Sequence, residues 1–420
     1  MTDESASDDL GPVEVDEVLG QQIEAQRADL LEKFEIPDAF PEAVLEEAEV
    51  HATTVEDEIT EALEQRRDLR DLTAFTVDPV DAQDFDDAIS IEHDGDDYRL
   101  WVHIADVSHY VEPGTAMWSE ARRRATSVYL PGYTIHMLPA VLAETVCSLV
   151  PQEDRLAHTV EMHIDGESLS FESIDIYKSV IESDERLTYT VAEHRLEDPD
   201  APLHDDLATV FELADRMHEQ RKADGSLVLN PRRDRAHTIV EECMLKANKA
   251  VTHELMWNRG VEAMYRVHPQ PTPEEWDKAL REIQELDGVS IPADSLDDPR
   301  IAVNATLETA PAHQLNKIQR AVLRVMPRAM YMSDPFGGHH ALNFEIYGHF
   351  TSPIRRLSDL INHWIVETND VPSDVAAACE HASDRQQAAE RCEREYRQLL
   401  QEVGLDPHEV NNRGLEVIEE

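Results

Sequence analysis

This sequence is poor in lysine, in cysteine and in long apolar runs. Lysine accounts for only seven of the 37 basic residues. A stretch of about 18 apolar residues does not occur, which excludes a membrane-spanning helix. The acidic first 17 residues lack the apolar segment of a secretory signal. The four cysteines show no CxxC spacing, so we expect reduced thiols in a cytoplasmic protein rather than a zinc site.

Positive charge as a whole is also scarce. The 420 residues include 88 acidic and 37 basic side chains, a formal charge of −51, although 41% of the residues are hydrophobic and suffice for a core. At about 1 M salt the Debye length is about 3 Å, so this self-repulsion is screened, whereas in dilute salt it opposes the compact state. We therefore expect a cytoplasmic protein of a halophilic archaeon. An acidic mesophilic protein, or one with basic partners, is the alternative.

The pattern of apolar residues divides the chain into four parts. Residues 1–17 are expected to be disordered, and residues 18–70 to form two or three helices interrupted at "IPDAFP". Residues 71–370 begin with strand patterns and continue mainly as helices. They include hairpins around "DGDD" at 94–97 and around "DGES", and a short strand "GSLVLN". Residues 371–420 are expected to form a helical tail. Because strands and helices do not alternate regularly, we predict an α+β fold.

The stretch "FTVDPVDAQDFDDAIS" holds five aspartates between two apolar, strand-like segments. An acidic run is common in so acidic a chain and can simply be solvated. Here, however, the flanking segments must reach the core, where unpaired carboxylates cost several kcal/mol each. Mg²⁺ prefers oxygen ligands and removes that cost, and two such ions about 3.5–4 Å apart can hydrolyse a phosphodiester. A metal site is the sharper prediction for this stretch.

A second stretch, "HFTSPIRRLSDLINH", combines a helix start with two arginines. Thr351 or Ser352 can cap the helix, and Pro353 fits its first turn. The helix dipole gives no reason for Arg355 and Arg356 to lie there, since that end prefers anions. A phosphate bound by the arginines and the free N–H groups would explain them. Ion pairs with the abundant carboxylates are the alternative.

Both stretches resemble blocks of the ribonuclease II/ribonuclease R (RNB) family of exoribonucleases. "TVDPVDAQDFDDAIS" resembles the family signature DPxxAxDxDDA, and similar blocks follow in the family's order: "VHIADVSHYV", "VYLPGYTIHMLP", "IVEECMLKAN" and "HFTSPIRRLSDLINH". The resemblance implies an RNB catalytic domain over 71–370, with a mixed or antiparallel sheet wrapped by helices around a central RNA channel. It also implies a 3′→5′ exoribonuclease that uses Mg²⁺, or Mn²⁺ instead, to hydrolyse single-stranded RNA to nucleoside 5′-monophosphates.

The resemblance further assigns roles to individual residues. The aspartates that hold the metals in the family fall on Asp78, Asp84, Asp86 and Asp87. The residues implied to act in catalysis are Asp86, Arg355 at the scissile phosphate and Glu390 in the tail helix. The residues implied to contact RNA are Tyr129, Tyr189, Glu241, Leu229 and Arg356. In the family, the residue at Tyr129 stacks on the 3′-terminal base, and those at Tyr189 and Glu241 are linked to recognition of the ribose.

Each of these roles has a plainer alternative. Tyr129 can be a core residue and Tyr189 a surface tyrosine of a strand. Glu241 and Glu390 can be solvated acids on helices, and Asp81 lies outside the family pattern. Three basic runs, "ARRRA", "NPRRDR" and "IRR", are expected to line one channel and attract the phosphate backbone; salt bridges on helix faces are the alternative.

The chain also departs from the family. We expect the barrels that usually flank the core, of the cold-shock and OB type, to be missing. Leu229 falls where the family has an aromatic clamp and offers no π-face. We therefore expect a separate RNA-binding protein or degradation complex as partner. An endonuclease or RNA 3′-end trimming enzyme on the same core, a catalytically weak RNA-binding scaffold and a metal-binding structural protein are the rival functions.

Overall fold

The computed structural model describes residues 11–230, 233–295 and 297–418. At its centre is a seven-stranded sheet with the order β10-β3-β4-β5-β8-β9-β2. Its strands are β2 (Arg67–Asp68), β3 (Phe75–Asp78), β4 (Asp87–Asp94), β5 (Asp97–Ala105), β8 (Asp154–Ile164), β9 (Phe171–Glu182) and β10 (Glu185–Thr188). Strands β3 to β9 pair as antiparallel neighbours, whereas β10 and β2 join the edges in parallel. This mixed sheet, combined with many helices, confirms the predicted α+β fold.

The two predicted hairpins are present. β4 and β5 are connected at "DGDD", where Gly95 has a φ of 68°, a conformation that glycine adopts without strain. β8 and β9 are connected around "DGES". The strand predicted for "GSLVLN" was wrong, because this segment is irregular. After β5 ends at Ala105, the chain forms a short helix, α3 (Val107–Tyr110).

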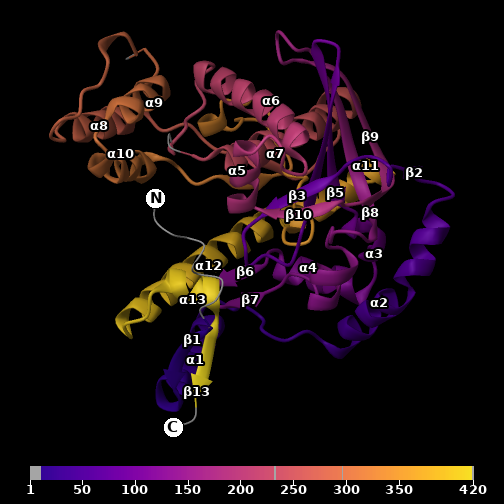
Figure 1. The fold of residues 1–420 in the computed structure, drawn as a ribbon. Coiled ribbons are helices and arrows are strands. Elements are labelled where there is room, and N and C mark those ends of the chain that lie inside the picture. Colours follow the sequence, from indigo (N-terminus) through magenta and orange to yellow (C-terminus); the bar gives the residue numbers. More distant parts are fainter. Residues whose placement is uncertain (1–10, 231–232, 296, 419–420) are drawn as a thin grey trace.

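Helices enclose the sheet (Figure 1). They are α2 (Glu42–Ala62), α3, α4 (Ala116–Arg124), α5 (Tyr189–Glu197), α6 (His204–Ala223), α7 (Arg235–His253) and α11 (Leu357–Thr368), with π-helical turns at 141–146 and 254–259. α6 packs against β4, and α7 packs against β5 and β8. β8 is buried along nearly its whole length, as expected of a strand that is covered on both faces. Among the described helices, none combines the length and the apolar character that a bilayer crossing requires.

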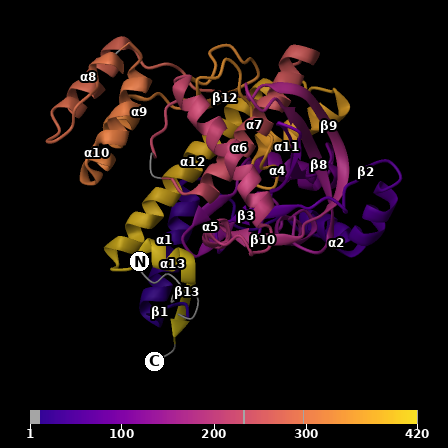
Figure 2. The same cartoon turned by 45° about the horizontal axis from the view of Figure 1, so that its top comes forward.

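A helical lobe stands to one side of the sheet, as both views show (Figures 1 and 2). It consists of α8 (Pro273–Gln284), α9 (Pro299–Thr309) and α10 (Ala312–Val325). Thr272 and Glu275 form a capping box at the start of α8, which satisfies two N–H groups reciprocally. The lobe has its own hydrophobic core, which includes Trp276, Val303 and Ile318. A small antiparallel pair, β11 (Tyr265–Val267) and β12 (Met330–Met332), flanks it in the sequence.

Segments near the two ends of the chain lie side by side. β1 (Val13–Asp16) pairs in parallel with β13 (Leu415–Ile418). The predicted disorder of 1–17 is therefore wrong for residues 13–16, while residues 1–10 lie outside the described part. The tail, predicted to be helical, contains α12 (Val375–Glu402) and α13 (Pro407–Arg413) but ends in a strand. A second hydrophobic cluster joins α1 (Glu17–Lys33) and α12 to the hairpin of β6 (Val128–Leu130) and β7 (Tyr133–Ile135).

Candidate active site

One cavity of about 970 Å³ brings together most of the residues singled out in the sequence. Those that line it are Asp78, Asp84, Asp86, Asp87, Tyr129, Tyr189, Glu241, Arg355 and Arg356. They come from the β3–β4 loop, β6, α5, α7 and the turn before α11, which are far apart in the sequence. The cavity lies at the edge of the sheet where β3 and β10 end.

The aspartates lie where the chain leaves β3 and returns into β4. Asp78 is the last residue of β3 and Asp87 the first of β4, and Asp84 and Asp86 lie in the loop between them. Because β3 and β4 are paired strands of the core, this loop is anchored at both ends. Asp86 is only 3% exposed, whereas Asp81, in the same loop, is exposed and accepts a hydrogen bond from Asn411.

Burial raises the pKa of three of these carboxyl groups. It raises the pKa of Asp78 to about 6 and that of Asp87 to about 7, with Asp78 adding to the shift at Asp87. Burial also puts the pKa of Asp86 well above its ordinary range, although Arg355 opposes the shift. Oδ2 of Asp78 is buried and has no hydrogen-bond partner among the described residues. Arginines such as Arg355 oppose these shifts but do not cancel them, so the buried carboxylates are a donor set that suits a hard divalent cation.

Asp86 connects the aspartate loop to the turn that precedes α11. Its Oδ1 accepts from the backbone N–H of Ile354 at 2.8 Å, and its Oδ2 accepts from Nε of Arg355 at 3.2 Å. Nη2 of Arg355 donates to Oγ of Ser352 at 2.9 Å. The guanidinium is thus held along one side, while the Arg355 side chain remains 41% exposed in the cavity that it lines.

The helix after this turn begins later than predicted. Arg356 is the N-cap of α11, so Thr351 and Ser352 do not cap this helix and Pro353 is not in its first turn. The buried carboxylate of Asp359 explains the difference, because it accepts from the backbone N–H of Ser352 and from Nε and Nη2 of Arg356. Arg356 therefore forms the ion pair that was the alternative for these arginines.

Tyr129 reaches the aspartates from β6. Its hydroxyl donates to Oδ2 of Asp84 at 2.8 Å, and burial raises its pKa well above the usual range. Its backbone N–H donates to Oε1 of Glu393 on α12 at 3.0 Å. Glu390, which was expected to act in catalysis, lies one turn earlier on α12, where it is exposed and accepts from Gln386. Glu393 is thus a site residue that the sequence interpretation missed.

Tyr189 is positioned by the parallel pairing of β10 with β3. Thr188, the last residue of β10, is in register with Asp78, so the next residue lies beside the aspartates. The Tyr189 ring stacks on His237, with centroids 3.7 Å apart and planes 5° apart. Nδ1 of His237 lies 2.5 Å from Oδ1 of Asp234, the N-cap of α7. His237 also lines the cavity, and the sequence analysis did not identify it. Its place three residues after Asp234, a residue type that caps helices, could have indicated that it lies in the first turn of α7.

Glu241 lies on α7 with its carboxylate between two arginines. It forms an ion pair with Arg233, and Nη2 of Arg221 lies 3.3 Å from its Oε1. Arg221 also binds Glu242, which is buried. Glu241 is therefore a half-buried, paired carboxylate that lines the cavity, rather than the solvated acid of the alternative interpretation.

Leu229 lies elsewhere. It packs against the core of the helical lobe, and its carbonyl accepts from Gln319 on α10. Leu229 is therefore not among the residues that line this cavity, and the expectation that it falls where the family has an aromatic clamp stays a prediction.

The basic runs are divided between the cavity and the surface. In "ARRRA", Arg123 and Arg124 pair with Glu120 and Arg122 pairs with Asp374, so the prediction that this run lines the channel was wrong. In "NPRRDR", Arg233 lines the cavity and Arg235 pairs with Glu193, while residues 231–232 lie outside the described part. Both arginines of "IRR" line the cavity.

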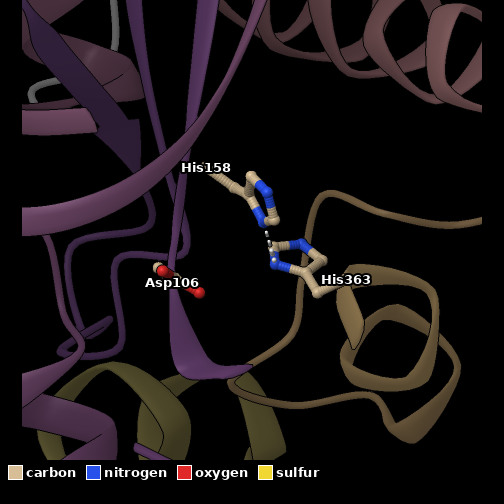
Figure 3. A group of neighbouring side chains, drawn as sticks. All are labelled: Asp106, His158 and His363. Carbon is tan, nitrogen blue, oxygen red and sulfur yellow. Dashed lines mark hydrogen bonds between the residues drawn. The ribbon is translucent and has the colours of Figure 1, made fainter. Parts of the chain in front are cut away.

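A buried group outside the cavity has the composition of a metal site. Its members are Asp106, His158 and His363 (Figure 3). Within the described ranges, they are the His, Cys, Asp or Glu side chains that offer three ligand atoms all within 4.8 Å of one another. Nε2 of His363 donates to the carbonyl oxygen of Phe350 at 2.8 Å, which leaves its Nδ1 to accept from Nδ1 of His158 at 3.3 Å. Burial lowers the pKa of both imidazoles, that of His363 to about 4, so both are neutral and mutually hydrogen-bonded.

The charges around this group disfavour a metal ion. Arg66 and Lys178 lie 2.7 Å and 3.3 Å from Oδ2 of Asp106, and they hold its pKa well below the usual range in spite of its burial. A divalent cation would meet two positive charges that already neutralise the only carboxylate of the group. The group is a structural network that connects β8 to α11.

Comparison with known proteins gives a consistent family. The model of the RNB domain matches residues 66–369. Ribonuclease R of Chlamydia muridarum is 36% identical over 354 residues, which cover 79% of this chain and 50% of the relative. Ribonuclease R of Thermotoga maritima is 37% identical over 358 residues, with coverages of 79% and 49%. The chain therefore spans about half the length of the curated relatives that it matches.

Solved structures share the fold. The apo form of Mycoplasma genitalium RNase R superposes with a TM-score of 0.79 at 26% identity, covering 91% of this chain and 64% of that one. The same nuclease bound to ribose-methylated single-stranded RNA gives a TM-score of 0.78 at 25% identity, with coverages of 90% and 64%. Yeast Ssd1, a pseudonuclease, gives 0.71 at 23% identity, with coverages of 81% and 45%, and shows the fold alone.

Proposed function

Because this chain belongs to the RNB-domain family, we propose that it is a 3′→5′ exoribonuclease that hydrolyses single-stranded RNA to nucleoside 5′-monophosphates. The observation that carries the proposal is the cavity in which the four aspartates meet Tyr129 and Arg355. The RNA-bound structure of M. genitalium RNase R, which shares the fold, supports RNA as the substrate class.

The aspartates are the groups that would hold Mg²⁺, with Mn²⁺ as the alternative. The raised pKa values of Asp78, Asp86 and Asp87 and the unpartnered Oδ2 of Asp78 fit a bound dication, because each reflects a carboxylate without a sufficient counter-charge. When bound, such an ion supplies a Lewis acid that activates water and stabilises charge on the phosphate.

Arg355 is suited to orient the scissile phosphate. Its hydrogen bonds to Asp86 and Ser352 fix the plane of the guanidinium and use Nε and Nη2. Among the described residues, Nη1 has no hydrogen-bond acceptor, and the side chain is partly exposed to the cavity. A planar donor held in this way pairs with phosphate oxygens at little further entropic cost.

A further part of the cavity wall is suited to the nucleoside at the 3′ end. Tyr129 is anchored at its hydroxyl by Asp84, which leaves a ring face for a base. Glu241 lies near the stacked pair of Tyr189 and His237 in the same cavity and can accept a hydrogen bond from a ribose 2′-OH. DNA lacks that donor, so this wall would favour RNA.

Rival functions on the same core make different predictions. Yeast Ssd1 has this fold and is a pseudonuclease, so the fold by itself does not establish hydrolysis. The presence of all four aspartates in one cavity favours an enzyme over a scaffold. An endonuclease would cleave an RNA whose 3′ end is blocked, whereas the proposed exonuclease requires a free 3′ end.

The test is therefore degradation of a 3′-blocked and an unblocked single-stranded RNA by the full chain, in molar KCl with Mg²⁺. We expect mononucleotides from the unblocked RNA alone, and equal cleavage of both substrates would contradict the proposal. Asp94→Asn is a control for variants of the quartet, because Asp94 is exposed at the end of β4 and is not among the residues that line this cavity. It should retain full activity.

We further propose that the protein acts in the cytoplasm and that a separate RNA-binding protein assists it. All four cysteines are buried and free, as expected of thiols in a reducing compartment. The second proposal rests on the expectation that Leu229, which offers no π-face, falls where the family has an aromatic clamp on the RNA.

A further inference from the structure

Two of the seven lysines of this chain lie one turn apart on α7 and line the same cavity. Lys246 and Lys249 contribute to a cavity of about 330 Å³ between α6, α7 and residues 342–344. It is distinct from the candidate active site, although Leu245 lines both. Such a concentration of lysine is unexpected in a chain in which arginine carries most of the positive charge.

Neither lysine is neutralised by a carboxylate. In the described part of the chain, the lysines that form ion pairs are Lys33, Lys178 and Lys222. Nζ of Lys246 donates instead to the carbonyl oxygen of Leu169 at 2.5 Å, and Nζ of Lys249 lies 5.2 Å from the centre of the Phe344 ring. In a protein with 88 acidic residues, two unpaired cations side by side need an explanation.

One of the two acids that line the cavity, Glu242, already has cationic partners. Glu242, which lines the cavity, accepts from Nη2 of Arg221 at 2.5 Å and lies 2.9 Å from Nδ1 of His218. These partners hold the pKa of Glu242 below its usual range in spite of burial. The ammonium of the half-buried Lys246 is therefore repelled by that of the exposed Lys249, and neither forms an ion pair with Asp224, the other acid that lines the cavity. Holding the Lys246 charge there is costly. A bound anion removes this cost.

The rest of the lining indicates which anion. Met217, Leu342 and Phe344 supply apolar lining, and Asn343 and Ser226 add polar groups. Cavities of about 300–1,000 Å³ that combine an apolar wall with a few polar groups are typical of small-molecule sites. A single phosphate ion fills only a fraction of such a space, whereas a nucleotide places its phosphate at the lysines and its base against the apolar lining.

We propose that this cavity binds a mononucleotide, with its phosphate held by Lys246 and Lys249 and its base beside Phe344. The site is separate from the hydrolytic centre, so this binding does not depend on the proposed hydrolysis. If the chain does release nucleoside 5′-monophosphates, its own product belongs to the class of ligand that the site takes. Arg221 would then connect the two cavities, because it contacts both Glu242 and Glu241.

Protonation provides an independent signature. Burial, together with repulsion from Lys249, lowers the pKa of Lys246 to about 7, while Glu242 opposes the shift. The other charged groups that line the cavity are Arg221 and Asp224. A phosphate favours the ammonium form, so binding near neutral pH should take up a proton. Calorimetry in two buffers with different heats of ionisation measures this uptake.

The experiment is calorimetric titration of the full chain with adenosine 5′-monophosphate, inorganic phosphate or adenosine. The protein carries Asp86→Asn and is saturated with a single-stranded oligonucleotide, so that the first cavity is occupied. We expect the nucleotide to bind, and Lys246→Met and Lys249→Met each to weaken binding about tenfold or more, the typical effect of losing a hydrogen bond to a charged group. Lys317→Met, an exposed lysine of α10, should change nothing.

The outcomes separate the possibilities. Equal binding of phosphate and the nucleotide would show a simple anion site and overturn the nucleotide assignment. Equal binding of adenosine, or nucleotide binding that both lysine variants leave intact, would overturn the role of the lysines. Lys249 is exposed, so its variant should fold even where Lys246→Met does not. A failure of RNA hydrolysis in the unvaried protein would contradict the proposed function and leave this binding result unaffected.

Discussion

The burial of the aspartates, with repulsion between them as a smaller cause, predicts a pH-dependent penalty on stability that Asp87→Asn removes in metal-free protein. The ordinary pKa is 3.8, and the folded protein raises that of Asp87 to about 7. A difference of about 3 pH units corresponds to about 4 kcal/mol, at 1.36 kcal/mol per unit. Asp78, at about 6, contributes to the same repulsion, so the effects of the two residues are not additive.

The direction follows from proton binding. Between the ordinary pKa of 3.8 and the raised value of about 7, the folded protein holds a proton on Asp87 that the unfolded chain has released. Stability therefore falls as pH rises through this window, and the full penalty is present above the folded pKa. Asparagine has no charge to desolvate, so Asp87→Asn should gain up to about 4 kcal/mol relative to the unvaried protein as pH rises from about 4 to about 8.

Urea unfolding followed by circular dichroism, in EDTA and at constant molar KCl, measures this effect. The readout is the difference between the two proteins, because buried histidines such as His158 and His363 titrate in both and oppose the trend. Saturating Mg²⁺ should reduce the gain or reverse it, since an ion at about 100 times its Kd adds about 2.7 kcal/mol to the unvaried protein. A difference that does not change with pH in EDTA would refute the reasoning.

Four further predictions concern activity and salt. Asp86→Asn should lower hydrolysis by about 10²–10³ and leave RNA binding nearly intact, because losing one preorganised transition-state interaction has that typical cost; residual activity above about a tenth would contradict it. Arg355→Lys should be nearly as damaging as Arg355→Ala, since an ammonium does not reproduce the bonds to Asp86 and Ser352; near-normal turnover of the lysine variant would show that Arg355 supplies only bulk charge. The melting temperature should rise between about 0.1 and 2 M KCl as the charge of −51 is screened, and a flat profile would exclude the halophilic interpretation. A chase with excess unlabelled RNA should stop degradation of labelled RNA, as expected of distributive trimming, and continued degradation to the end would show that the core is processive by itself.

Sequence patterns correctly predicted those parts of the fold that depend on residues close together in the chain. The hairpin at "DGDD" follows from turn chemistry, and the apolar segments that flank it form the largely buried strands β4 and β5. The start of α11 was misplaced because the preference of "TSP" for a helix start competes with Asp359, whose contacts with Ser352 and Arg356 are only partly local. The contacts of the Asp359 carboxylate outweighed the capping preference of "TSP". The sequence alone does not show which of the two effects is stronger.

The candidate site likewise contains residues that the sequence could identify and residues that it could not. The aspartates were identifiable because acids between two core strands conflict with burial, and that conflict is visible in the sequence. Glu390 and Glu393 are not distinguishable in this manner, because both lie on α12 three residues apart and only its packing against β6 decides which one meets Tyr129. Lys246 and Lys249 became informative only when the fold placed them in one cavity.

The parallel pairing of β1 with β13 also has a mechanical consequence. Val13 is in register with Leu415 and Asp16 with Ile418, so the chain enters the pair at one end and leaves it at the other. A force that pulls the two ends of the chain apart therefore acts along both strands and loads their hydrogen bonds together in shear, rather than peeling them one at a time. The hydrogen bonds between β1 and β13 therefore carry this force, so that α12 and the contact between Glu393 and Tyr129 are not stretched by it.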